Sequence, residues 1–370
     1  MEFLFFTLTL IGIAIFHNRT LPIALGGLFS ILLFKLIFRN LNLLTHLQHE
    51  SVLILNIFGL LIGFAVLADY FEKSKVPDLL PDILPDDWKG GFYLLVMVFI
   101  ASAFLDNIAA AMLGGAIAKK IFNNKVHIGF IAAIVAASNA GGSGSVLGDT
   151  TTTMLWISGI SAITVLPAYI AAIPAFLFLA IIASKKQDVY NRITKDAPKK
   201  LKIEYKYLLF SLLILISAVI TNIVYDLPSL GVWVAIIISR FIITLNLNIV
   251  REAIPGSIFL SSLILSASLM PVESLPSPST LSTFNLGVIS SVFDNIPLTK
   301  LAIEQGAYNW AMLAYAVGFG GSMIWFGSSA GVAICNEFPE GRSVKNWIKN
   351  AWFIPVAYVI GFICLMMLQA

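Results

Sequence analysis

The stretch SNAGGSGSVLGDTTTTMLW, residues 138–156, lies inside a long apolar segment and interrupts it with glycine, serine and aspartate. Glycine and serine at this density do not sustain a regular helix, because each destabilises a helix interior relative to alanine. Asp149 follows the glycine-rich part directly, and threonines occupy 150–153. The stretch therefore predicts a helix that unwinds at its centre and presents a carboxylate there.

The composition places that break inside a membrane. Of the 370 residues, 58% are hydrophobic and 12% are charged, which is about half the charged fraction of a soluble domain. Each crossing needs roughly 20 apolar residues, so the chain has room for about ten crossings and for no large extramembrane domain. We predict an all-α polytopic membrane protein in a lipid bilayer, which excludes a soluble enzymatic or nucleic-acid-binding module. Cys335 and Cys364 are the only cysteines, so a disulfide framework and a zinc cluster are excluded as well.

Two successive sets of apolar runs divide the chain into repeats of the same order. The first repeat, residues 1–184, is expected to contain helices at 3–16, 21–38 and 51–69, a hairpin at 91–122, an interrupted helix at 127–158 and a helix at 162–184. A basic linker, 185–206, follows it. The second repeat, residues 207–370, is expected to contain three helices up to residue 270, a hairpin at 282–305, an interrupted helix at 308–338 and a helix at 346–368.

Individual residues repeat as well. Asp106-Asn107-Ile108 recurs 188 residues later as Asp294-Asn295-Ile296. The glycines at 141, 142 and 148 and the serine at 143 all recur 179 residues later. Two such matches, in the same order within equivalent segments, indicate an internal repeat.

The basic residues predict the orientation of each repeat. The linker 185–206 holds eight lysines and arginines, which places it in the cytoplasm by the positive-inside rule. Counting crossings from this linker requires the hairpin 91–122 to be re-entrant and to open to the cytoplasm. The hairpin 282–305 then opens to the outside, and both termini lie outside. The result is an inverted-topology repeat, typical of secondary transporters, which we expect in a bacterial cytoplasmic (inner) membrane.

Three aspartates, Asp106, Asp149 and Asp294, fall at the predicted breaks of embedded segments. An ionisable group at that depth costs on the order of 3 kcal/mol, so it normally faces a polar cavity or an ion pathway. Carboxylate, amide and hydroxyl oxygens are hard ligands that suit a hard cation. A proton competes with such a cation for the same oxygens, and this competition is sufficient for coupled exchange.

Simpler structural roles are also open for these residues. Asp149 is placed to cap the half-helix that follows it, a role compatible with ion binding. The glycine and serine stretches could be close-packing helix surfaces without any break. Lys300 and Glu304, spaced i,i+4, could form a structural ion pair.

Four segments of the chain are similar to segments of a known family. The stretch 138–156, together with FLDNIAAAM at 104–112, FDNIPL at 293–298 and GFGGSMIWFGSSAGVA at 318–333, resembles signature segments of the ion transporter superfamily. The likeness is greatest to NhaD-type sodium/proton antiporters and covers nearly the whole chain. It implies two inverted repeats, each with a re-entrant hairpin and an interrupted helix, with ions bound where these four elements meet. It also implies a homodimer with a scaffold domain and a transport domain that moves in an elevator fashion.

Residue by residue, the resemblance implies the same ion site. The Na⁺ candidates are Asp106, Asn107, Asp149, Asp294 and Asn295, supported by Asn139, Ser143, Thr150, Thr151, Ser322 and Ser328. The chain departs from the family at Gly144, Ser145 and Val146, where those antiporters tend to have an aromatic residue and a proline. Lys300, inside the second hairpin, is a further departure that could favour an anionic substrate.

The leading prediction is a secondary transporter, not an enzyme, that exchanges Na⁺ or Li⁺ for H⁺ and needs no cofactor. A sodium-coupled carrier of an organic anion or oxyanion, such as a di- or tricarboxylate or arsenite, is the alternative. Aspartates at both hairpin tips argue against it, since they repel anions. An intramembrane aspartyl protease is a remote alternative, because Val146 stands where its signature has glycine and the third aspartate would have no role.

Overall fold

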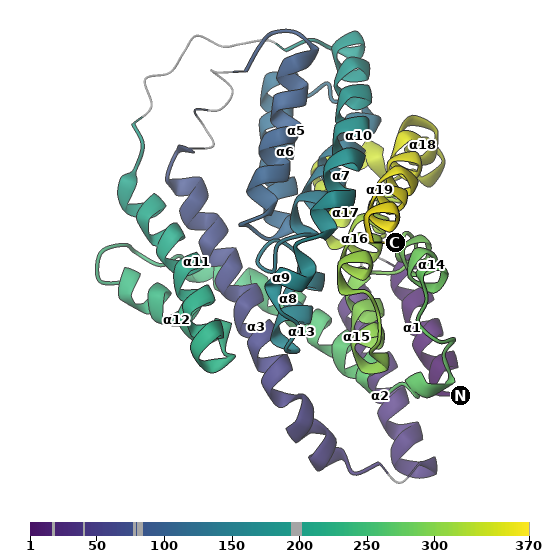
Figure 1. Ribbon diagram of the computed structural model, residues 1–370. Helices are drawn as coiled ribbons and strands as arrows, with labels where there is room; N and C mark the ends of the chain where they lie inside the picture. Colours follow the sequence, from purple (N-terminus) through teal and green to yellow (C-terminus); the bar gives the residue numbers. More distant parts are fainter. Residues whose placement is uncertain (17–18, 40, 77–78, 80–83, 194–201, 370) are drawn as a thin grey trace.

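The computed structural model describes residues 1–16, 19–39, 41–76, 79, 84–193 and 202–369, and the described chain contains helices and no strand. Figure 1 shows the helices as an elongated bundle. The first half comprises α1 (Glu2–Ile15), α2 (Thr20–Phe38), α3 (Leu43–Lys73), α5 (Trp88–Ser102), α6 (Asn107–Ile121), α7 (Ile128–Gly142), α8 (Thr150–Ile157), α9 (Ala162–Val165) and α10 (Ala168–Tyr190).

The second half begins with α11. It comprises α11 (Tyr205–Tyr225), α12 (Pro228–Ser239), α13 (Leu247–Ser268), the 3₁₀ turn η2 (Val272–Ser274), α14 (Thr280–Ser290), α15 (Asn295–Gln305), α16 (Trp310–Gly320), α17 (Ser329–Glu337), the turn η3 (Pro339–Arg342), α18 (Val344–Asn350) and α19 (Phe353–Gln369). Polar residues between the apolar runs fix several helix starts. Asn42 accepts a hydrogen bond from the backbone N–H of Thr45, and Ser279 and Ser282 form a capping box at α14.

Five helices in the described chain are long and apolar enough to cross a membrane, namely α2, α3, α10, α11 and α13. The bent pair α18 and α19 makes a sixth if it is one span. Shorter apolar helices, α1, α5, α7, α12 and α16, accompany them. The chain is therefore an integral, polytopic membrane protein, as its composition predicts.

Several boundaries differ from the expected ones. The helix expected at 346–368 is two helices that meet at an angle of 60°. The helix expected at 162–184 is split into α9 and α10, and α10 continues to Tyr190, so the expected linker 185–206 begins inside a helix. Residues 194–201 of that linker lie outside the described residues. Lysines at 185 and 186 extend the helix because lysine is a good helix former, although its charge ends the apolar pattern.

The breaks expected from the sequence are present. The chain leaves helical geometry between α5 and α6, between α7 and α8, between α14 and α15, and between α16 and α17. These elements pack on one another: α5 and α6 contact α7, α14 and α15 contact α16, α6 contacts α17, and α15 contacts α8. We call these eight helices, together with α10 and α19, the central group.

Equivalent positions in the two halves make equivalent contacts in the central group. The Ser102 hydroxyl donates to the Ser138 carbonyl at 2.6 Å, and the Ser290 hydroxyl donates to the Val317 carbonyl at 2.8 Å. Each donor ends the first helix of its hairpin, and each acceptor belongs to the adjoining interrupted helix. The sequence offsets, 188 between the donors and 179 between the acceptors, are those of the repeated motifs.

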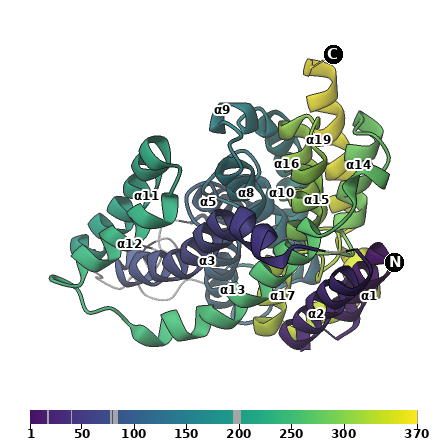
Figure 2. The same ribbon diagram turned by 90° about the horizontal axis from the view of Figure 1, so that it is seen from below.

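The remaining long helices form a second layer. Contacts run in the order α1, α2, α13, α3, α12 and α11, so these six helices make a continuous outer band along the central group. Figure 2 shows α11 and α12 at one end of this band and α1 and α2 at the other. The band meets the central group through contacts of α3 with α8 and of α13 with α15.

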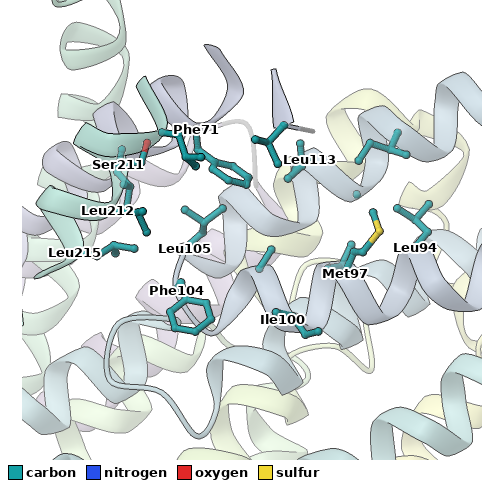
Figure 3. A pocket seen from close by; sticks show the side chains of 17 residues that line it. Phe71, Leu94, Met97, Ile100, Phe104, Leu105, Leu113, Ser211, Leu212 and Leu215 are labelled. Atoms are coloured by element: carbon teal, nitrogen blue, oxygen red, sulfur yellow. The ribbon is translucent and has the colours of Figure 1, made fainter. Parts of the chain in front are cut away.

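An apolar cleft of about 390 Å³ lies between the outer band and the central group. Figure 3 shows Phe71 of α3 and Leu212 of α11 on one wall, and Met97 of α5 and Leu113 of α6 on the other. The described residues that line the cleft carry no charge, so it is unsuited to an ion.

Candidate functional site

Asp149 lies at the centre of the polar constellation. It occupies the N-cap position of α8 in an extended conformation, φ −144° and ψ 143°, yet its side chain makes no capping hydrogen bond. The carboxylate is 1% exposed. Its Oδ1 accepts from the Asn107 amide at 2.9 Å and from the Asn295 amide at 3.4 Å. Its Oδ2 is buried and has no hydrogen-bond partner among the described residues.

The two amides come from the two hairpins, since Asn107 begins α6 and Asn295 begins α15. The Asn107 amide also donates to Asn139 Oδ1 at 2.9 Å, and the Asn139 amide donates to Ser322 Oγ at 2.9 Å. Asn139 belongs to α7 and Ser322 follows α16, so the network joins both hairpins to both interrupted helices. All five side chains are less than 5% exposed.

Asp106 and Asp294 have a different role from Asp149. Each caps the second helix of its hairpin, Asp106 Oδ1 accepting from the Ile108 N–H at 2.9 Å and Asp294 Oδ1 from the Ile296 N–H at 3.0 Å. Their backbone angles agree within a degree, φ −51° and ψ 142° against φ −52° and ψ 142°. Ser329 also donates to Asp294 Oδ2 at 2.9 Å, a contact that the sequence did not indicate.

The other predicted residues divide into two kinds. Thr150 and Thr151 are buried at the start of α8, and Thr151 Oγ1 has no hydrogen-bond partner in the described chain. Ser143 and Ser328 use their hydroxyls locally instead. Ser143 donates to the Ala140 carbonyl at 2.8 Å, and Ser328 accepts from the Gly331 N–H at 3.3 Å as the N-cap of α17.

Within the described chain, no three carboxylates, imidazoles or thiolates converge closely enough to hold a metal ion by themselves. A cation at this site would need a mixed set of oxygens, from one carboxylate, amides, hydroxyls and the unwound backbone. Such sets are typical of hard monovalent ions, and unwound backbone at membrane depth supplies part of them. Asp149 Oδ2 and Thr151 Oγ1 are buried oxygens without a hydrogen bond of ordinary geometry, and Thr151 lies near enough to interact with the Asp149 carboxylate.

Lys300 is not part of this network. Its ammonium lies 2.5 Å from Glu304, which confirms the ion pair predicted from the i,i+4 spacing. It also lies 2.9 Å from Glu50 of α3, and both of these side chains are at most 4% exposed. The sequence did not indicate Glu50, because the pair spans 250 residues and neither charge lies in a recognisable motif.

The known proteins that the chain resembles are named sodium/proton antiporters. No family model matches the chain. The chain is 25% identical over 320 residues to sodium/proton antiporter 1 of Arabidopsis thaliana, an alignment that covers 73% of the chain and 52% of the plant protein. It is 24% identical over 337 residues to the Na⁺/H⁺ antiporter NhaD of Vibrio parahaemolyticus, covering 75% of the chain and 80% of the relative. The chain is 26% identical over 337 residues to the Na⁺/H⁺ antiporter NhaD of Alkalimonas amylolytica, an alignment that covers 75% of the chain and 67% of the relative. The chain thus spans about half the length of the plant relative and two thirds or more of the bacterial ones.

Proposed function

We propose, from its similarity to NhaD-type sodium/proton antiporters over about three quarters of its length, that this chain exchanges Na⁺ or Li⁺ for H⁺ across a membrane. The observation that carries the proposal is the state of Asp149. One oxygen of its buried carboxylate is held by amides from both hairpins, and the other oxygen has no partner in the described chain.

A carboxylate in this setting suits exchange. The two amides fix its position, and the second oxygen takes either a proton or a cation. Because the two ligands use the same oxygen, binding of one displaces the other. Asp106, Asp294, Asn139, Thr150, Thr151 and Ser322 are proposed to complete the polar environment, and Ser143 and Ser328 to hold the broken helix ends.

We further propose that residues 1–184 and 207–370 are inverted repeats. The matched serine contacts and the matched backbone angles of Asp106 and Asp294 support this proposal. The division into a central group and an outer band supports an elevator-type motion, in which the central group carries the ion past the band. A homodimeric assembly, a bacterial inner-membrane location and external termini belong to the same proposal.

The alternatives receive less support. Lys300 was the feature that favoured an anionic substrate, but its charge is neutralised by Glu50 and Glu304. An aspartyl protease needs two carboxylates that share a proton. Among the described residues, no carboxylate is hydrogen-bonded to Asp149, and Asp106 and Asp294 each cap a helix instead.

The test is proton movement in proteoliposomes that contain a pH-sensitive dye. NaCl, LiCl, KCl and choline chloride are added in turn to vesicles with the wild-type protein, Asp149→Asn or Asp226→Asn. Asp226 is an exposed residue after α11 and serves as the matched control. Na⁺ or Li⁺ should cause proton movement with the wild type and the control. Asp149→Asn should show no proton movement, although the variant is inserted and folded. Equal rates in all three proteins would remove Asp149 from the mechanism. Silence of the wild type with every cation would favour the anion carrier, to be screened with citrate, succinate and arsenite.

A further inference from the structure

Two cavities reach the hairpin aspartates. The Asp106 cavity, about 460 Å³, is lined by Asp106 of the first hairpin and by α3 and α13. The Asp294 cavity, about 490 Å³, is lined by Asp294 and Ser329 and by α1, α13 and α17. The two cavities share three lining residues, namely Ile108, Glu252 and Gly256. Glu252 is therefore the one acidic residue that borders both.

Both cavities lie toward the same end of the bundle. Their lining includes Asp69 and Glu72 in the last turns of α3, Glu252 near the start of α13, and Asn336 near the end of α17. The Glu204 N–H donates to the Ser74 carbonyl at 3.0 Å, so the end of the basic linker reaches the same end of the bundle. In the proposed topology this end faces the cytoplasm.

The charges on these walls are of one sign. The described lining of the two cavities includes acidic side chains and no lysine or arginine. Asp69 is paired with Lys73 at 2.7 Å, whereas Glu252 is exposed and forms no ion pair in the part of the chain that the structure describes. A cavity with low-dielectric walls and one sign of charge focuses the field and raises the local concentration of counter-ions.

We propose that Glu252 is a specificity-determining residue that draws cations from the cytoplasmic side into both cavities and thereby sets the apparent affinity on that side. The proposal rests on the cation exchange proposed above. Glu252 is not a ligand in the ion site, because it is exposed and lies on the outer band, whereas Asp149 is buried in the central group. Its effect is electrostatic, so it acts on KM and is screened by salt.

The first experiment measures cation-dependent proton movement in everted membrane vesicles, whose outer surface is the cytoplasmic face. At low ionic strength, Glu252→Gln should raise the KM for Na⁺ about threefold, as expected for one charge near a cavity mouth. Glu252→Lys should raise it further, Glu252→Asp should restore it, and the maximal rate should be retained. Added choline chloride should remove the differences. Glu273→Gln changes an exposed glutamate in η2 that borders neither cavity and serves as the control. An unchanged KM in Glu252→Gln, or the same rise in Glu273→Gln, would overturn the proposal.

A second experiment does not depend on transport. Ala333, on the wall of the Asp294 cavity, is changed to cysteine after Cys335 and Cys364 are replaced by serine. The protein is labelled with a cationic and an anionic thiol reagent of similar size. With Glu252 present the cationic reagent should react faster, and Glu252→Gln should reduce the ratio of the two rates about threefold. An unchanged ratio would refute the steering role. A changed ratio in a protein that exchanges no cation would leave the steering role intact and refute the proposed function instead.

Discussion

At the scale of single residues, the three membrane aspartates differ in what their oxygens do. Asp106 and Asp294 each give one oxygen to a backbone N–H, so they stabilise the starts of α6 and α15. Asp149 occupies an N-cap position without capping, and both hairpins hold it through side-chain amides. The capping role that the sequence suggested for Asp149 therefore belongs to the other two aspartates. This difference is the reason why Asp149, and not Asp106 or Asp294, is proposed as the residue that binds and releases the ion.

The buried pair of Lys300 and Glu50 yields a prediction at the same scale. Lys300→Met should destabilise the protein by about 3–5 kcal/mol, because it leaves the buried Glu50 carboxylate with only the exposed His49 imidazole at 3.4 Å. The double variant Lys300→Met with Glu50→Gln should recover much of this loss, because no unpaired buried charge remains and Glu304 is partly exposed. Thermal melting of the solubilised protein measures both effects. Lys349→Met, at an exposed position, is the control and should melt like the wild type. A double variant that melts no higher than the single one would show that the charge of Glu50 is not the cause.

At the scale of elements, two interrupted helices pass very close to the hairpins. A Cβ on Gly141 would overlap the Phe99 carbonyl of α5, and a Cβ on Gly320 would overlap the Gly287 carbonyl of α14. Backbone atoms cannot move aside as a flexible side chain can. The glycines therefore allow each hairpin to lie against its interrupted helix, and the close approach brings the hairpin asparagines to Asp149.

This geometry predicts the effect of one added methyl group. Gly141→Ala and Gly320→Ala should each lower the stability by about 1–3 kcal/mol through overpacking, and by similar amounts because the contacts are equivalent. Gly26→Ala on α2, where a Cβ meets nothing within 4 Å, should melt at or above the wild-type temperature, since alanine is the better helix former. The melting temperatures of the three variants, compared with that of the wild type, test this prediction. A harmless substitution at either tight position would mean that the hairpin does not pack against its interrupted helix as the structure shows.

The features that could be predicted from the sequence are those caused by residues within the same short segment. Glycine, serine and aspartate break helices wherever they cluster, so the interruptions at 143–149 and 321–328 and both hairpin tips were predictable. The 60° bend between α18 and α19 also has a local cause, although the expected helix at 346–368 ignored it: Pro355 has no N–H for the Ala351 carbonyl, and its ring excludes a helix that continues through Ala351. The pairing of Glu50 with Lys300 and the grouping of six helices in an outer band depend on tertiary packing, which hydropathy does not encode.

At the scale of the whole molecule, the polar site lies within the central group and the outer band covers one side of it (Figures 1 and 2). The interface between the two includes an apolar cleft on the α11 side and two acidic cavities along α13. An apolar cleft is unfavourable for ions, whereas the acidic cavities are the proposed entry for cations. Access to the hairpin aspartates in this structure is therefore from the end of the bundle where α3 ends and α13 begins.

The side of the membrane on which that end lies follows from the topology, which predicts a labelling pattern. Val189, 89% exposed at the end of α10, should be cytoplasmic, and Leu281, 69% exposed at the start of α14, should be external. Each is changed to cysteine in a background without the native cysteines, and intact cells are treated with an impermeant thiol reagent. Leu281→Cys should react at once, and Val189→Cys only after the cells are permeabilised. The reverse pattern would show that the orientation in the membrane is opposite to the proposed one. The acidic cavities would then open to the outside, and the proposed effect of Glu252 would concern the KM for external cations. Equal labelling of both positions in intact cells would contradict the inverted repeat, because the chain must cross the membrane between them an odd number of times.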